Sequence, residues 1–202
     1  MIKAIIFDWG GVIAPNPLGG WLGSLATKVN MTIEETLSHW NAAGYKDLSR
    51  GTIDDKEFFR LFEISLGRKL PDDVSRIWID GSAFNPWPEM LNFIKQLKEN
   101  GIKVGILSNT VKPMSDIAIQ RGLYDGFAPL ILSSVVGSVK PELPIYQRAL
   151  DELHLSANEC VYIDDLPKNL ISANALGMIT ILASDNPSET IDLIQRVLKN
   201  NL

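Results

Sequence analysis

The sequence has little cysteine and no excess of positive charge, and each shortage excludes a class of protein. Its single cysteine, Cys160, cannot form an internal disulfide, so a disulfide-rich secreted scaffold is excluded and a reducing compartment is expected. Lysine and arginine number 19 against 24 aspartates and glutamates, which gives a formal net charge of −5. Without a basic stripe to neutralise phosphates, no nucleic-acid partner is expected.

Long hydrophobic runs are also missing. No apolar stretch approaches the roughly 20 residues that a membrane-spanning helix needs. The N-terminus has no charged segment ahead of a long apolar one, so we expect no signal peptide, no membrane partner and a cytoplasmic location. With 46% hydrophobic and 21% charged residues, the 202-residue chain can still bury the core of one domain, or of one domain with an insertion.

Short apolar runs alternate with helical patterns over most of the chain. Because these runs are mostly apolar throughout, they are typical of parallel strands covered on both faces. The alternation predicts an α/β fold with a three-layer, Rossmann-like core around a parallel sheet. The expected strands are Ile2–Phe7, Lys103–Leu107, Leu130–Ser133, Val161–Asp164 and Met178–Leu182, and the expected helices are Glu89–Glu99, Pro113–Arg121, Leu143–Leu153, Lys168–Leu176 and Ser188–Lys199.

One segment interrupts this alternation. From about Trp21 to Ile79 the pattern is purely helical, and turn-rich stretches flank it at 14–20 and 81–88. Such an insertion is typical of a hinged cap, and a helical layer fixed against the core is the alternative. We expect residues 1–14 and 86–202 to form the core and residues 15–85 to form a small all-helical cap. Its expected helices are Trp21–Val29, Ile33–Ala43, Asp54–Leu66 and Asp72–Ile79.

Polar residues follow the expected strands at the points where these strands end. Asp8 directly follows the first strand and precedes Gly10 and Gly11, on a turn that a ligand can approach closely. In open α/β sheets, ligands bind beyond the carboxyl ends of the strands. The side chains expected to gather there are those of Asp8, Ser108, Lys140, Asp164 and Asp165.

The adjacent carboxylates Asp164 and Asp165 predict a metal site. Like charges this close are costly unless a cation joins them. Mg²⁺ prefers one or two carboxylates together with waters and substrate phosphate. We therefore expect Asp8, Asp164, Asp165 and the Gly10 carbonyl to bind Mg²⁺, and one aspartate of the pair can also cap the following helix.

Four motifs, in this order along the chain, resemble those of the haloacid dehalogenase-like (HAD) hydrolase superfamily. They are the stretch from Phe7 to Ile13, the stretch from Leu107 to Thr110, Lys140-Pro141, and Ile163-Asp164-Asp165 with Asn169 and Gly177. The helical insertion sits where that family has its type-one cap. The resemblance implies the HAD fold and a Mg²⁺-dependent phosphatase that acts on a small phosphorylated metabolite.

The same resemblance implies a role for each matching residue. Asp8 would be the nucleophile and would form an aspartyl-phosphate. Ser108 would donate its hydroxyl to a phosphate oxygen, and Lys140 would neutralise the phosphoryl group. The expected phosphate-binding residues are Ser108, Asn109, Lys140, Gly10 and Gly11, and Asn169 is expected to support the metal site.

Gly10 departs from the family pattern. Most phosphatases of this group have an aspartate at this position as general acid and base, and such help is typically worth roughly 10²–10⁴-fold in rate. Three interpretations stay open. The substrate has a good leaving group, such as an anomeric or acyl phosphate; a cap residue among His39, Asp47 and Asp54 supplies the proton; or the protein turns over slowly and serves by binding.

The dehalogenase branch also lacks that aspartate, so 2-haloacid dehalogenation is the competing chemistry. A carbon–halogen substrate needs no metal, so the acidic pair favours phosphate chemistry. Small phosphatases with glycine at this position resemble sugar-phosphate hydrolases, which makes a sugar phosphate one expected substrate. Candidate substrate contacts in the cap are Trp21, Trp40, Tyr45, Lys46 and Arg50. The alternative is that the three aromatic residues form the core of the helical bundle and that Lys46 and Arg50 are solvated surface charges. The sequence specifies no oligomeric state.

Overall fold

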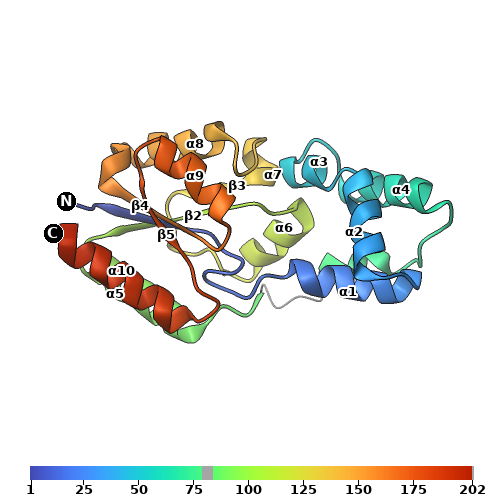
Figure 1. Cartoon of the computed structure of the whole chain (residues 1–202), viewed down its shortest axis with the longest axis horizontal. Helices are drawn as coiled ribbons and strands as arrows, with labels where there is room; N and C mark the ends of the chain where they lie inside the picture. Colours follow the sequence, from blue (N-terminus) through green and yellow to red (C-terminus); the bar gives the residue numbers. More distant parts are fainter. Residues whose placement is uncertain (79–83, 202) are drawn as a thin grey trace.

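A computed structural model describes residues 1–78 and 84–201 (Figure 1). Five parallel strands form one sheet in the order β3-β2-β1-β4-β5. This arrangement confirms the expected α/β fold class. Because β1 lies between β2 and β4, the strand order reverses beside β1, where sheets of this type bind ligands. The strands are β1 (Ala4–Phe7), β2 (Lys103–Ser108), β3 (Leu130–Leu132), β4 (Cys160–Asp164) and β5 (Ile179–Leu182).

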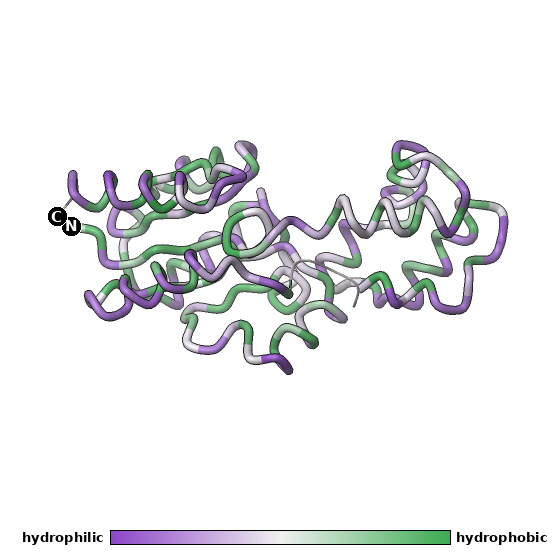
Figure 2. Tube along the Cα trace, turned by 90° about the horizontal axis from the view of Figure 1, so that it is seen from below, coloured by the Kyte–Doolittle hydropathy of each residue, from purple (hydrophilic) through white to green (hydrophobic). Residues whose placement is uncertain are grey.

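Helices cover both faces of the sheet. In Figure 1, α8 (Leu143–Leu153) and α9 (Pro167–Ala175) lie on one side, and α5 (Pro88–Glu99) and α10 (Pro187–Asn201) lie on the other. Helix α6 (Lys112–Gln120) buries Met114 and Ala118 in the same cluster as α5 and α10. Figure 2 shows strands of mostly hydrophobic colour between helices that alternate between the two colours. The three-layer core expected from the sequence is therefore present.

The helices that follow β1 and precede α5 project beyond one end of the sheet (Figure 1). Their centre is aromatic: the fully buried Trp40 lies 4.9 Å from Phe58 and 5.6 Å from Trp78 between ring centroids. Thr32 and Glu35 form a capping box at one helix start. The elements of this helical insertion are α1 (Leu18–Val29), α2 (Ile33–Ala42), α3 (Tyr45–Arg50), α4 (Asp55–Leu66) and the 3₁₀ helix η1 (Val74–Trp78).

Two short helices differ from the sequence-based expectation. Helix α3 lies between Gly44 and Gly51, both with positive φ, and its six residues are too few to show a helical period. Strand β3 ends at Leu132 because Ser133 begins helix α7 (Ser133–Val136) instead of ending the strand. The Ser133 hydroxyl accepts a hydrogen bond from the backbone N–H of Thr110, which turns it toward the neighbouring strand end.

The helix expected over Asp72–Ile79 is shorter and tighter than predicted. The N–H of Val74 donates to the carbonyl of Pro71, and the N–H of Arg76 donates to that of Asp73. These three-residue hydrogen bonds define the 3₁₀ helix η1. Ile79 and part of the turn-rich stretch 81–88 lie outside the described residues. Within the described ranges, no helix combines the length and apolarity needed to cross a membrane.

Candidate active site

Three residues identified from the sequence lie at the carboxyl ends of neighbouring strands. Asp8 follows β1, Ser108 is the last residue of β2, and Asp164 is the last residue of β4. Because β1 pairs in register with both neighbours, the three strands end at the same level. A cavity of about 220 Å³ opens at this edge. Its lining includes Asp8, Gly10, Ser108, Asn109, Lys140, Asp165 and Asn169.

A single lysine joins two of the carboxylates. The ammonium nitrogen of Lys140 lies 2.8 Å from Oδ2 of Asp8 and 2.7 Å from Oδ2 of Asp164. All three residues are buried. Charges at this depth are stable only when they are matched and hydrogen-bonded, so the lysine offsets both carboxylates at once.

Asp164 uses both of its oxygens inside the protein. Its Oδ1 accepts hydrogen bonds of 2.9 Å from the backbone N–H of Leu166 and from the amide of Asn169. Its Oδ2 accepts from Lys140 and from the hydroxyl of Tyr162. A carboxylate offers about four acceptor positions, and four donors occupy those of Asp164. This residue therefore orients Lys140 and Asn169.

The adjacent Asp165 has the opposite character. Its Oδ1 is buried and has no hydrogen-bond partner within the described chain. Its Oδ2 lies 3.4 Å from the amide nitrogen of Asn16. One oxygen from each of Asp8, Asp164 and Asp165 lies within 4.8 Å of the other two. A buried carboxylate oxygen without a donor is costly, so the donor set fits a hard cation such as Mg²⁺.

The pKa values in this cluster shift in different directions. Burial raises the pKa of Asp8 to about 7, although the charge of Lys140 opposes the shift. Burial also raises the pKa of Asp165, and the charge of Asp164 adds to that effect. Burial alone would raise the pKa of Asp164, but the charge and hydrogen bond of Lys140 hold it below the usual value. Asp8 and Asp165 are therefore the carboxylates that a further cation would stabilise most.

Two asparagines support these charged groups. Oδ1 of Asn109 accepts the backbone N–H of Lys140 at 2.8 Å, and its Nδ2 donates to the Lys140 carbonyl at 3.1 Å. Asn109 therefore positions the lysine in addition to lining the cavity. Asn169 is buried in α9, and its side-chain amide donates a hydrogen bond to Asp164. Its backbone carbonyl accepts a hydrogen bond from the Tyr146 hydroxyl. The hydrogen bonds to Asp164 and from Tyr146 fix the position of Asn169 beside the cavity.

Gly11 lies where a side chain would displace Asp165. Its φ is +81°, and a Cβ atom there would lie 2.4 Å from Oδ2 of Asp165. Gly10 has no positive φ, and a Cβ atom there would meet only Pro17 Cδ at 3.3 Å and Asn16 Cα at 3.7 Å. Both the space and the backbone conformation therefore require glycine at position 11, whereas neither requires it at position 10.

The sequence analysis missed Tyr162, Asn16 and Tyr124. Tyr162 lies two residues before Asp164 in β4, so both side chains point to the same face of the sheet. Tyr124 lines the cavity and packs edge-on against Trp9, with ring centroids 4.9 Å apart. Spacing by two from Asp164 could have identified Tyr162, whereas no sequence pattern distinguishes Asn16 or Tyr124.

The insertion places two of its expected substrate contacts at the cavity. Trp21 and Tyr45 are among the lining residues. Trp40 instead belongs to the aromatic core of the insertion. Lys46 and Arg50 reach the core: Oε1 of Glu142 lies 3.0 Å from Nζ of Lys46 and 2.7 Å from Nη2 of Arg50.

The three residues considered as proton donors lie elsewhere. Nδ1 of His39 is 2.7 Å from the hydroxyl oxygen of Ser65. Asp54 caps α4 by accepting the N–H of Glu57, and Asp47 lies in the first turn of α3. None of the three is among the described residues that line the cavity. The structure therefore gives no support to a proton supplied from these positions.

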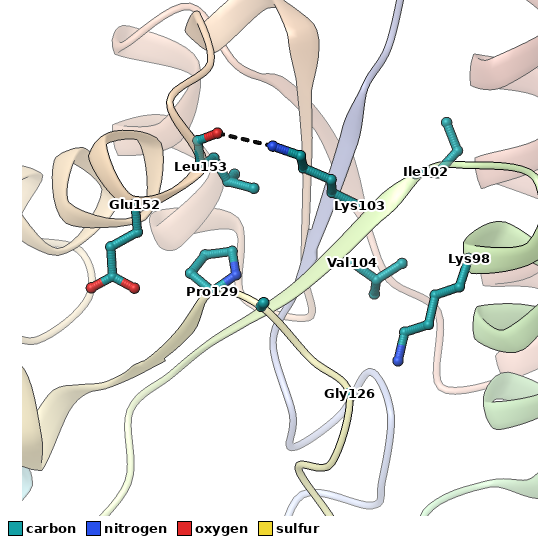
Figure 3. A pocket seen from close by; sticks show the side chains of 9 residues that line it. Lys98, Ile102, Lys103, Val104, Gly126, Pro129, Glu152 and Leu153 are labelled. Carbon is teal, nitrogen blue, oxygen red and sulfur yellow. Dashed lines mark hydrogen bonds between the residues drawn. The ribbon is translucent and has the colours of Figure 1, made fainter.

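A second cavity, of about 410 Å³, lies at the opposite ends of the strands (Figure 3). Lys103 and Val104 line it at the start of β2, and Pro129 lines it just before β3. Figure 3 shows the ammonium group of Lys103 directed at the carbonyl of Leu153, 3.2 Å away. Asp8, Asp164 and Asp165 are all absent from its lining, so the cavity beside Asp8 is the candidate active site.

Comparisons with known proteins show which sequences and structures this chain is similar to. A sequence model described as haloacid dehalogenase-like hydrolase matches residues 2–177. The chain is 25% identical to a sesquiterpene phosphatase of Aspergillus oryzae, over 96% of each chain. It is 29% identical to a glyceraldehyde 3-phosphate phosphatase of Methanocaldococcus jannaschii, over 76% of this chain and 69% of the other. A HAD family enzyme of Bacteroides thetaiotaomicron, solved with magnesium and inorganic phosphate, is 20% identical with a TM-score of 0.72, covering 94% of this chain and 98% of the other.

Proposed function

Because the chain belongs to the haloacid dehalogenase-like hydrolase family, we propose that it is a magnesium-dependent phosphatase of a small phosphorylated metabolite. The observation that carries this proposal is the contrast between the two adjacent aspartates. Asp164 is saturated by donors, whereas Asp165 keeps a buried oxygen without a partner beside Asp8. Two relatives named as phosphatases support the same reaction class.

Asp8, Asp165 and the Gly10 carbonyl would hold the metal, with Asp164 among its near neighbours. The unpartnered oxygen of Asp165 and the raised pKa of Asp8 are both features that a divalent cation would relieve. When bound, Mg²⁺ supplies charge neutralisation for the phosphoryl oxygens. The related enzyme solved with magnesium and phosphate shares the fold, which makes this ion the natural first test.

The chemistry on the protein itself takes two steps. A carboxylate oxygen of Asp8 bonds to phosphorus while the bond from phosphorus to the leaving oxygen breaks. Water then attacks the phosphorus of the aspartyl-phosphate, which releases inorganic phosphate and regenerates Asp8. Lys140 offsets negative charge on the phosphoryl group, and Ser108 donates its hydroxyl to a phosphoryl oxygen.

Gly10 supplies no proton to the leaving oxygen. The leaving group must therefore depart as an anion, or take its proton from water, which favours phosphate esters of acidic hydroxyls and acyl phosphates. We assign residues 15–85 the role of a cap, because Trp21 and Tyr45 of the insertion line the same cavity as Asp8. Closure over the site would exclude water from the first step. A sugar phosphate and a cytoplasmic location stay predictions from the sequence.

Phosphate release from acyl, anomeric, primary-alcohol and aryl phosphates tests the proposal. Each substrate is assayed with Mg²⁺ and with EDTA, using the natural protein and Asp8→Asn. We expect release that requires Mg²⁺, disappears in the variant and is fastest for good leaving groups. Chloride release from 2-chloropropionate with EDTA present would assign the dehalogenase reaction instead. Tight binding of phosphate without any turnover would assign a binding role.

A further inference from the structure

The cavity beside Asp8 has two ends of different chemistry. Asp8, Lys140 and Asp165 form the charged end, at the carboxyl ends of β1 and β4 and on the loop before α8. The other walls come from α1, α6, Tyr124 after α6 and Phe84 before α5. Their side chains are apolar or aromatic, and Trp21 and Met114 are 4% and 6% exposed.

Aromatic rings supply much of the second end. The rings there are those of Trp9, Trp21, Tyr45, Phe84 and Tyr124. Trp9 packs edge-on against Tyr124, and the guanidinium of Arg121 lies 4.6 Å from the centre of the Phe84 ring. Because these rings are held by other side chains, the wall is formed before any ligand binds.

Most amide groups at the cavity are already engaged by the protein, whereas Oδ1 of Asn169 and Nε1 of Trp21 have no hydrogen-bond partner within the described residues. Asn109 bonds to the backbone of Lys140, Asn169 bonds to Asp164, and Asn16 lies 3.4 Å from Asp165. A leaving group with several hydroxyls would lose water against the aromatic wall, whose polar side-chain groups are limited to the indole N–H groups of Trp9 and Trp21 and the hydroxyls of Tyr45 and Tyr124. An unpaired buried hydroxyl costs roughly 1–3 kcal/mol in proteins, so a sugar fits this wall poorly.

The aromatic wall and the glycine at position 10 therefore favour the same kind of leaving group. The wall favours an apolar, flat group, and Gly10 requires a leaving oxygen that is stable without a proton. The volume of about 220 Å³ is below that of most ligand pockets and favours a small group of about one ring. Resting on the phosphatase function proposed above, we propose that the site hydrolyses aryl monophosphates with a single aromatic ring.

The reaction balances with water alone. A carboxylate oxygen of Asp8 bonds to phosphorus as the bond from phosphorus to the aryl oxygen breaks. The aryloxide takes a proton from water, and the hydroxide left behind takes the proton that the hydrolytic water releases in the next step. A second water cleaves the aspartyl-phosphate, so the products are a phenol and inorganic phosphate. No oxidant, reductant or second substrate is needed.

Four substrates separate leaving-group acidity from polarity. Phenyl phosphate is apolar with a good leaving group, and cyclohexyl phosphate is apolar with a poor one. Acetyl phosphate is a small polar substrate with a good leaving group, and glucose 6-phosphate is polar with a poor one. We expect phenyl phosphate to have the highest kcat/KM and cyclohexyl phosphate to be at least about 10²-fold slower, because the general acid is missing. Glucose 6-phosphate should be slower than cyclohexyl phosphate.

Met114→Gln tests the wall itself, and Met114→Leu is its matched control. The amide has nearly the shape of the methionine but should be poorly paired against a ring. We expect the ratio of kcat/KM for phenyl phosphate over acetyl phosphate to fall about tenfold in Met114→Gln, mainly through KM, and to hold in Met114→Leu.

The possible failures are distinguishable. A preference of the natural protein for glucose 6-phosphate over phenyl phosphate would overturn the aryl assignment and leave the phosphatase standing. So would an unchanged substrate ratio in a folded Met114→Gln protein. Absence of Asp8-dependent phosphate release from all four substrates would overturn the phosphatase function, and the aryl assignment with it.

Discussion

The ammonium nitrogen of Lys140 lies 2.7 Å from Oδ2 of Asp164, and both side chains are almost completely shielded from solvent. The same nitrogen also contacts Asp8. Its removal would therefore leave two buried carboxylates without their common cation. Removing one partner of a buried ion pair destabilises the fold far more than the intact pair stabilises it.

Lys140→Met should lose turnover and lower the free energy of unfolding by about 3–5 kcal/mol, the cost of leaving buried charge unmatched. Urea unfolding followed by circular dichroism measures the change. The matched control is Lys112→Met, since Lys112 pairs with Asp116 on the surface of α6 and should matter little. Equal effects of the two substitutions would contradict the central position given to Lys140.

Asp8→Asn should abolish turnover, by about 10⁴-fold or more, because an amide cannot act as the nucleophile. The fold should be retained, since the two side chains have nearly the same shape. Release of phosphate from the best substrate measures the loss, and circular dichroism reports the fold. Normal activity in a folded Asp8→Asn protein would show that the nucleophile lies elsewhere.

The same substitution should also change how stability depends on pH. Burial raises the pKa of Asp8 to about 7, so in the metal-free protein its carboxyl destabilises the fold increasingly as pH rises from about 4 to 7. Asn cannot ionise and removes this penalty. In EDTA, Asp8→Asn should therefore gain stability relative to the natural protein on going from pH 5 to pH 8. A constant difference between the two proteins over this range would contradict the raised pKa.

Much of this site follows from the sequence because its residues come directly after buried strands. The apolar runs predict β1, β2 and β4, and parallel pairing then brings Asp8, Ser108 and Asp164 to one edge. The sequence does not distinguish the surroundings of the adjacent residues Asp164 and Asp165. Their different surroundings depend on donors from Lys140, Tyr162 and Asn169, which come from a loop, from β4 and from α9.

The missed features depend on contacts between distant segments. Helix α3 has only six residues, so it shows no periodicity and owes its place to packing against α7. Gly51 approaches so closely that a Cβ atom there would lie 2.4 Å from the Ser134 carbonyl oxygen. The Ser133 hydroxyl donates to the Ser49 carbonyl at 2.6 Å. Local sequence patterns carry no information about such approaches.

Gly11→Ala should weaken Mg²⁺ binding by roughly 10–100-fold, the range found when supporting contacts of a metal site are disturbed. The added methyl group would displace Asp165, and the positive φ adds roughly 1–2 kcal/mol of backbone strain. Titration calorimetry with Mg²⁺ measures the affinity. Gly10→Ala is the matched control, because it needs only a small shift of Pro17 and should have a smaller effect. The opposite order would place the metal away from Asp165.

Arg50→Met should loosen the contact between the insertion and the core. Arg50 and Lys46 of α3 share the carboxylate of Glu142, two residues after Lys140 on the loop that carries this lysine. Burial alone would raise the pKa of Glu142, but Lys46, the Val139 N–H and Arg50 together lower it to about 2. Because the pKa is lowered, the stabilising contact is complete above about pH 4.5 and is lost only as the pH falls through about 2. Ordinary assay pH values should leave it intact.

Hydrogen exchange of the α3 amides measures this loosening. The pair is partly exposed, so we expect exchange to quicken only about 1.5- to 5-fold, and the difference to shrink in high salt. Arg60→Met is the matched control, because Arg60 pairs with Glu57 within α4. If α3 is docked through Glu142, Arg50→Met should also raise KM, since Tyr45 at the start of α3 lines the cavity. Equal exchange in the two variants would mean that packing of α3 on α7 alone holds the insertion in place.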